Sequence, residues 1–258
     1  MKVASYDDGL EFRFGNLPPI WIHFGLPLLA IFITAPLWGG FHPKWMAVAA
    51  IVIFGIIWSL LAHELAHALV ARGYGLTPVI IRLHAGGGEA LWEGESWIRH
   101  QDRLITLAGP ATNLVIGIVC LLAFTLLLPA PAQPFAPGSG GEWIRPPLPS
   151  AIPATLYALK WLGWLNLIWA GVNLLPAFPL DGGHLFYGII EQRYGQRRAL
   201  FWTGLLGLIF AVLAKIMFVA GILAGMVIWS PPYVSPNWQA IKSSRRDTAT
   251  IINLHKPL

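Results

Sequence analysis

Long apolar runs separated by short polar segments dominate the sequence. A helix that crosses the hydrocarbon core of a bilayer needs about 20 residues. Four runs reach that length, namely Trp21–Trp38, Trp45–Ala71, Leu104–Leu128 and Ile152–Phe178. A fifth run, Ala199–Trp229, carries Lys215 near its middle and is long for one helix but short for two. The pattern predicts an all-α polytopic membrane protein with about six transmembrane helices, five being the alternative.

Basic residues predict the orientation of these helices, because short loops rich in Lys and Arg stay in the cytoplasm. The segments before the first run, between the second and third and after the fourth hold nine such residues, and the two opposite loops hold two, Lys44 and Arg145. The tail after the fifth run is basic too. An even number of crossings puts both termini in the cytoplasm, so we expect a tight hairpin near Lys215. One long tilted helix with an external tail is the alternative.

The expected organisation is a single membrane-embedded domain over residues 1–230 and a basic cytoplasmic tail over 231–258. The helices are expected at about 21–38, 45–72, 104–128, 152–179, 199–215 and 216–229. Alternating apolar and polar positions predict short β-like segments near residues 10–14 and 79–83. A segment dense in Pro and Gly, from Pro129 to Pro153, is expected to be an outer linker.

Composition agrees with a membrane protein. Of the 258 residues, 56% are hydrophobic and only 11% are charged, against about 25% charged in soluble domains. The single cysteine, Cys120, excludes a disulfide scaffold within the chain. The net charge of +5 comes from basic residues scattered between the apolar runs and not gathered in one patch, so we expect no nucleic-acid partner.

The second run contains the sequence H-E-x-x-H, from His63 to His67. On a helix this spacing puts both imidazoles on one face, one turn apart, where their ring nitrogens can share one Zn²⁺. Glu64 then lies beside the metal, where its carboxylate can accept a proton from water. Ionisable side chains in a membrane helix lose hydration, so such residues are functional candidates by default.

A catalytic zinc site usually has three protein ligands and one open position. Apart from Glu64, Asp181 is the acidic residue that lies next to an apolar run, the others falling in predicted loops. Asp181 follows the fourth run at its inner end, and the positive-inside rule puts the end of the second run on that same side. We therefore expect His63, His67 and Asp181 to share one membrane depth and to bind one zinc ion per chain.

These residues resemble the intramembrane zinc metalloproteases of the site-2 protease family. The resemblance rests on H-E-x-x-H at His63–His67, on N-x-x-P-x-x-x-x-D-G at Asn173–Gly182 and on A-G-P-x-x-N at Ala108–Asn113. It implies zinc ligands at His63, His67 and Asp181, a general acid/base at Glu64 and a polar group near the reacting carbonyl at Asn173. The amide of Asn173 can donate a hydrogen bond to an oxyanion, or it can simply pack between helices.

The resemblance implies an integral, multi-pass protein of the cell (inner) membrane that cleaves single-span membrane proteins or signal-peptide remnants near the cytoplasmic side, in regulated intramembrane proteolysis. We expect a minimal form without the PDZ or CBS domains of many family members. His84 and Glu89 add polar groups where family members place apolar and glycine residues, which affects substrate preference. The alternatives are a metal transporter or sensor that uses the same ligands, and a pseudo-enzyme that binds helices without cutting.

Overall fold

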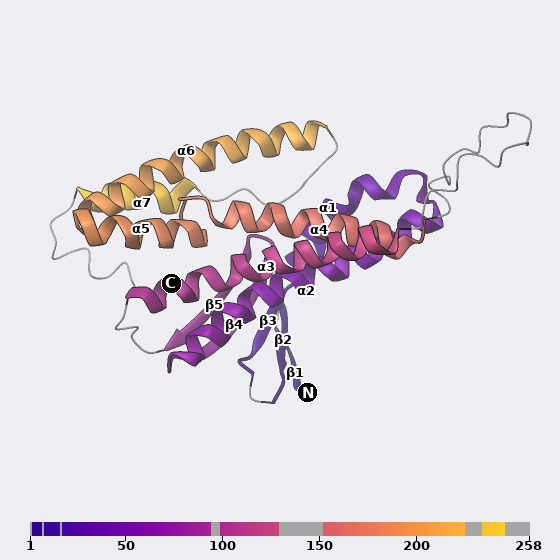
Figure 1. Ribbon diagram of the computed structural model, residues 1–258, viewed down its shortest axis with the longest axis horizontal. Helices are drawn as coiled ribbons and strands as arrows, with labels where there is room; N and C mark the ends of the chain where they lie inside the picture. Colours follow the sequence, from indigo (N-terminus) through magenta and orange to yellow (C-terminus); the bar gives the residue numbers. More distant parts are fainter. Residues whose placement is uncertain are drawn as a thin grey trace, which may run out of the picture.

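A computed structural model describes residues 2–6, 8–15, 17–93, 99–128, 152–224 and 234–245, and within them the chain is mostly helical (Figure 1). One group of helices packs around α2 (Pro43–Gly73) and contains α3 (Arg99–Leu127), α4 (Ala154–Asn173), α1 (Gly25–Thr34) and the short 3₁₀ helix η1 (Ala35–Phe41). A second group contains α5 (Asp181–Tyr194), α6 (Gln196–Leu223) and α7 (Val234–Ser244). The second group contacts the first mainly through α5 and α3.

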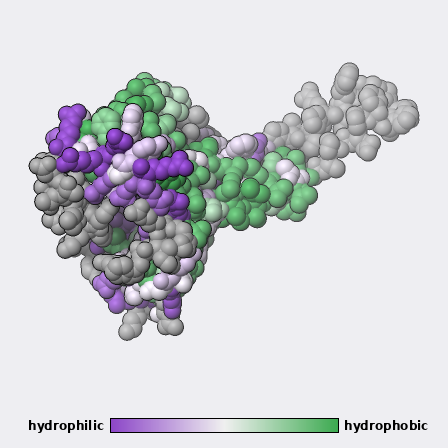
Figure 2. Space-filling model, turned by 60° about the vertical axis from the view of Figure 1, so that its left-hand side comes forward, coloured by the Kyte–Doolittle hydropathy of each residue, from purple (hydrophilic) through white to green (hydrophobic). Residues whose placement is uncertain are grey.

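Three described helices are long and apolar enough to cross a membrane: Pro43–Gly73, Asp102–Leu127 and Gln196–Leu223. Their outer faces expose large apolar side chains, such as Phe54 and Leu126. Figure 2 shows hydrophilic surface on the left-hand body of the molecule and hydrophobic surface at its top and on the narrower part that extends to the right. An apolar outer surface of this kind is favourable in a lipid bilayer and costly in water.

A five-stranded sheet accompanies the helices, in the order β1-β2-β3-β4-β5. All neighbours are antiparallel except the parallel pair β3–β4. The strands are β1 (Lys2–Tyr6), β2 (Gly9–Arg13), β3 (Ile20–His23), β4 (Thr77–His84) and β5 (Gly87–Glu93). The expected β-like segments fall within or overlap β2 and β4, but the prediction of an all-α protein misses the other three strands.

The first apolar run does not form one helix. Its first residues pair as strand β3, and the rest divides between α1 and η1, with Pro36 near the junction. Proline lacks the N–H that would continue the α-helix, which explains why α1 ends here and a separate helix begins. The expected helix 21–38 is therefore not found: the apolar helical stretch there, Gly25–Trp38, joins α1 to part of η1 and is shorter than a membrane span.

The expected hairpin at Lys215 is wrong, because α6 continues through this residue without a break. No Gly or Pro lies between Leu208 and Ala220, so the backbone has no reason to turn there. Lys215 is exposed on the helix surface, where its long side chain can extend toward the interface. Residues 225–229 of the second expected helix lie outside the described residues.

Within the expected tail, residues 234–244 form helix α7, which packs on the first half of α6. Buried residues recur at Asn237, Ala240 and Ile241, the spacing of a helix that buries one face. Residues 231–233 and 246–258 lie outside the described part of the chain, as do residues 129–151 of the expected linker.

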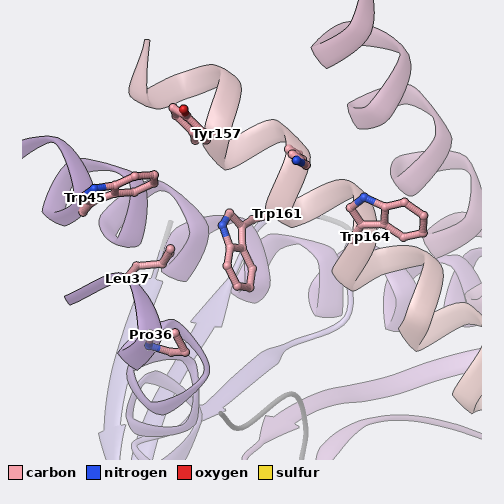
Figure 3. Close-up of a pocket in the computed structure, with 7 residues that line it drawn as sticks. Pro36, Leu37, Trp45, Tyr157, Trp161 and Trp164 are labelled. Carbon is pink, nitrogen blue, oxygen red and sulfur yellow. The ribbon is translucent and has the colours of Figure 1, made fainter. Parts of the chain in front are cut away.

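A cavity of about 520 Å³ lies between η1, the beginning of α2 and the beginning of α4 (Figure 3). Aromatic side chains form most of its walls, with Lys160 as its one charged lining residue; the aromatic residues are Trp45, Tyr157, Trp161 and Trp164. Trp45 precedes His63 by 18 residues on α2, or about 27 Å along a helix. The cavity is therefore at the opposite end of α2 from the H-E-x-x-H sequence.

Candidate active site

Helix α2 carries the three residues of the H-E-x-x-H sequence on its buried side. The exposed fraction is 3% for His63, 5% for Glu64 and 6% for His67. The two histidines are four residues apart, and their ring centroids lie 4.8 Å from each other. The spacing thus brings both rings to one helix face, as the sequence predicts.

Asp181 reaches the same place from the other helix group. It begins α5, where a carboxylate is favoured by the helix dipole. The preceding loop folds tightly onto the start of α5, because a Cβ at Gly182 would overlap the backbone of Leu174 and one at Gly183 would lie 2.6 Å from the carbonyl of Ala177. The two glycines after Asp181 are therefore required by close backbone packing, which sets the position of the carboxylate.

The side chains of His63, His67 and Asp181 converge on one point. The two Nε2 atoms are 3.1 Å apart, and the Asp181 carboxylate lies 3.1 Å from Nε2 of His63 and 3.4 Å from Nε2 of His67. Tetrahedral zinc with bonds of about 2.0–2.1 Å separates its ligand atoms by about 3.3 Å. Two imidazoles and one carboxylate are also a ligand set that zinc uses in catalytic sites. The residues present therefore fit a zinc ion.

Helix α3 closes one side of this ligand group. The carbonyl of Ile105 lies 2.7 Å from Nδ1 of His67, which leaves Nε2 directed at the other ligands. One turn further along α3, a Cβ at Gly109 would overlap Nε2 of both His63 and His67. Gly109, which lies in the A-G-P-x-x-N sequence, therefore faces the ligand atoms.

Strand β5 covers Glu64. A Cβ at Gly88 would lie 2.5 Å from Oε1 of Glu64, so glycine lets the backbone of β5 approach the carboxylate. His84 and Glu89 lie on β4 and β5 beside this contact, and Arg82 is 3.4 Å from Glu89. Burial lowers the pKa of the His84 imidazole, which keeps it neutral near pH 7.

Asn173 is the last residue of α4 and is half-buried. Within the described part of the chain its amide has no hydrogen-bond partner, so the geometry leaves it free to meet a ligand. Sequence reasoning missed a different residue, Asn237 of α7, which contacts the loop before Asp181. No motif or spacing marks Asn237 in the sequence.

The chain is similar to known proteins in sequence and in fold. The sequence profile described as "Peptidase family M50" matches residues 148–214, which include Asn173 and Asp181. A zinc metalloprotease of Methanocaldococcus jannaschii is 32% identical over 179 residues, or 69% of this chain and 45% of that protein. A candidate zinc metalloprotease of Mycobacterium tuberculosis, Rip3, is 30% identical over 195 residues, or 75% of this chain and 44% of that protein. The chain thus spans less than half the length of these two relatives.

A solved structure has the same fold. The site-2 protease from Methanocaldococcus jannaschii aligns with a TM-score of 0.54 and 24% sequence identity, over 92% of this chain and 93% of that chain. The likeness extends over both helix groups and is not limited to the histidine helix.

Proposed function

Because the chain belongs to peptidase family M50, the family of the site-2 zinc metalloproteases, we propose that it is a zinc-dependent endopeptidase that cleaves membrane-spanning substrates. The observation that carries this proposal is the convergence of His63, His67 and Asp181, whose ligand atoms lie within 4.8 Å of one another, beside the buried carboxylate of Glu64. A bound zinc ion would supply Lewis-acid chemistry, polarising a peptide carbonyl and making water more acidic.

Glu64 is the general acid/base in this proposal. Its carboxylate takes a proton from the attacking water and delivers it to the leaving amine. Its neighbours His63 and His67 lie on the same buried side of α2, and the backbone at Gly88 covers the Glu64 carboxylate from one side. Asn173 donates a hydrogen bond to the oxygen of the reacting carbonyl as negative charge develops there.

We propose that the substrate binds along the free edge of strand β5. Among the described residues, β5 pairs only with β4, and its other edge carries no strand. A membrane-spanning helix holds its carbonyls in internal hydrogen bonds, so it must unwind locally before it can react. The unwound segment adds to β5 as a strand, and the contact of Gly88 with Glu64 brings this segment next to the catalytic carboxylate.

The substrate class is a single-span membrane protein or a signal-peptide remnant, cut near the cytoplasmic side in regulated intramembrane proteolysis. The enzyme is an integral protein of the cell (inner) membrane with both termini in the cytoplasm. Helix α7 belongs to the basic tail that is expected in the cytoplasm, and it contacts the loop before Asp181. This contact supports a cytoplasmic position for the ligand end of the molecule. The basic residues near this end, such as Arg72 and Arg193, agree with a cytoplasmic location.

Hydrolysis is favoured over metal transport. Transport sites repeat along a path or between inverted halves. Among the described residues, His63, His67 and Asp181 form the one group of three or more side chains that could hold a metal ion. That part of the chain therefore contains no second metal site along a transport path.

The decisive experiment replaces Glu64 by Gln, which keeps the volume of the side chain but cannot accept a proton. Zinc content and folding should be retained, while cleavage of a single-span substrate in liposomes should fall by several orders of magnitude. Glu191→Gln is the matched control, because Glu191 is half-buried on α5 and its hydrogen bond from Tyr187 can be kept by a glutamine oxygen; this variant should cleave normally. Cleavage by Glu64→Gln at the wild-type rate would exclude this mechanism, and loss of zinc uptake into liposomes in that variant would favour a transporter.

A further inference from the structure

Helix α7 packs against the rest of the protein through a face that includes a polar side chain. Its buried residues are Asn237, Ala240, Ile241 and Ser243, and the side chain of Asn237 is fully buried. Ala240 packs in a cluster with Leu200 and Tyr187, against which Phe178 also lies. A buried amide is costly unless its hydrogen bonds are made, so the partners of Asn237 explain why it is there.

Asn237 makes two hydrogen bonds with one residue, Phe178. Nδ2 of Asn237 donates to the carbonyl oxygen of Phe178 at 2.7 Å, and the N–H of Phe178 donates to Oδ1 of Asn237 at 2.9 Å. The side-chain amide therefore binds both main-chain groups of Phe178, as a neighbouring strand would. Phe178 precedes Asp181 by three residues, in the loop that joins α4 to α5.

Two glycines of helix α6, Gly204 and Gly207, leave room for this contact. A Cβ at Gly207 would overlap Oδ1 of Asn237 and would lie 2.9 Å from Cα of Ala177 in the same loop. A Cβ at Gly204 would lie 2.7 Å from the main-chain oxygen of Asn237. The two glycines let α6, α7 and the loop meet at one place, so the position of the amide is determined from two sides.

We propose that Asn237 is a positioning residue for the metal group: by holding the peptide groups of Phe178, it fixes the loop that presents Asp181 to His63 and His67. The histidines need no such support from α7, because they stand on the long helix α2. Asp181 comes from the other helix group, and a metal ligand must be placed to within about 0.5 Å. This proposal rests on the proposed zinc site.

The test is the zinc dissociation constant of the purified full-length chain in detergent, measured by competition with a chromophoric chelator. Asn237→Ala removes both hydrogen bonds and should weaken zinc binding about 10- to 100-fold, as loss of a supporting residue typically does. Asn237→Asp keeps the acceptor for the N–H of Phe178 but sets an oxygen against its carbonyl, so it should also weaken binding.

Gly207→Ala is the second, independent variant. Alanine favours a helix more than glycine does, yet its Cβ would displace the amide of Asn237, so zinc binding should again weaken. Gly188→Ala on α5, where a Cβ meets no atom within 4 Å, is the matched control. Gln239→Ala, on the exposed face of α7, is the control for the helix itself, and both should bind zinc as the wild type does.

A purely structural role makes a different prediction. Ile33→Ala, in the apolar cluster at the other end of the molecule, should lower the unfolding temperature and leave zinc affinity unchanged. If Asn237→Ala and Gly207→Ala behave in this way too, the proposal is overturned. If Asn237→Ala does not fold, Asn237→Asp and Gly207→Ala decide between the same outcomes. Failure of the wild-type chain to bind zinc would instead refute the zinc site, and the proposed function with it.

Discussion

The ring of His67 and the main-chain carbonyl of Ile105 are joined by a hydrogen bond of 2.7 Å between helices α2 and α3. A carbonyl oxygen can only accept, so Nδ1 of His67 carries the proton and Nε2 is left with its lone pair for a metal. Such bonds fix both the tautomer and the orientation of a ligating ring. The position of α3 therefore bears directly on the ligand group.

The first prediction concerns Gly109, which faces this group from α3. Because a Cβ there would overlap Nε2 of both histidines, Gly109→Ala should abolish stoichiometric zinc binding while the protein still folds. Gly171→Ala on α4, where a Cβ meets no atom within 4 Å, should keep its zinc. Metal analysis of the purified proteins measures both, and a full zinc content in Gly109→Ala would contradict the described approach of α3.

The second prediction concerns the ligands. The wild-type chain should hold about one zinc ion, and His67→Ala or Asp181→Ala should reduce that amount sharply, because each removes one of three protein ligands. Elemental analysis after dialysis against a weak chelator gives the stoichiometry. Zinc retained in full by both variants would mean that the ion binds elsewhere.

The third prediction separates two roles of Asn173. If its amide stabilises an oxyanion, Asn173→Ala should lower the turnover rate about 10²- to 10³-fold with unchanged zinc content. If Asn173 only packs between helices, turnover should change little and the unfolding temperature should fall. Single-turnover cleavage and a thermal melt on the same preparation distinguish these outcomes.

The fourth prediction concerns topology. A reporter that is active only outside the cytoplasm should be silent when fused after Arg245 and active when fused after Gly138, because basic segments stay inside. Activity at Arg245 would put α7, and with it the loop before Asp181, on the outer side of the membrane. That result would reverse the proposed orientation of the active site.

Short-range sequence patterns were enough to predict the helix that carries the two histidines and the relative position of their side chains. The helix expected at residues 45–72 is α2, Pro43–Gly73, and the H-E-x-x-H spacing by itself set both histidines on one face. Asp181 required one more step, since only the charge of the loops put it at the same membrane depth as His63. The structure brings these residues together as expected.

Long-range contacts account for what the sequence did not show. Strand β3 pairs in parallel with β4, about 60 residues further along the chain, and no local pattern records such a pairing. The contact between Asn237 and Phe178 is of the same kind, because an isolated Asn in a polar tail has no distinguishing neighbours. At Lys215 a single charge in an apolar run suggested a turn, but α6 continues through this residue and the lysine side chain lies exposed on the helix surface.

The division of the ligands between two helix groups has a consequence for the whole chain. His63 and Asp181 are 118 residues apart, so an ion bound by both is a cross-link that closes a long loop. Because the unfolded chain has no preformed site, the free energy of binding such an ion is also free energy of folding. A chelator would then do more than stop the reaction, since it would also remove the link between α2 and the α5–α7 helices and lower the stability of the fold.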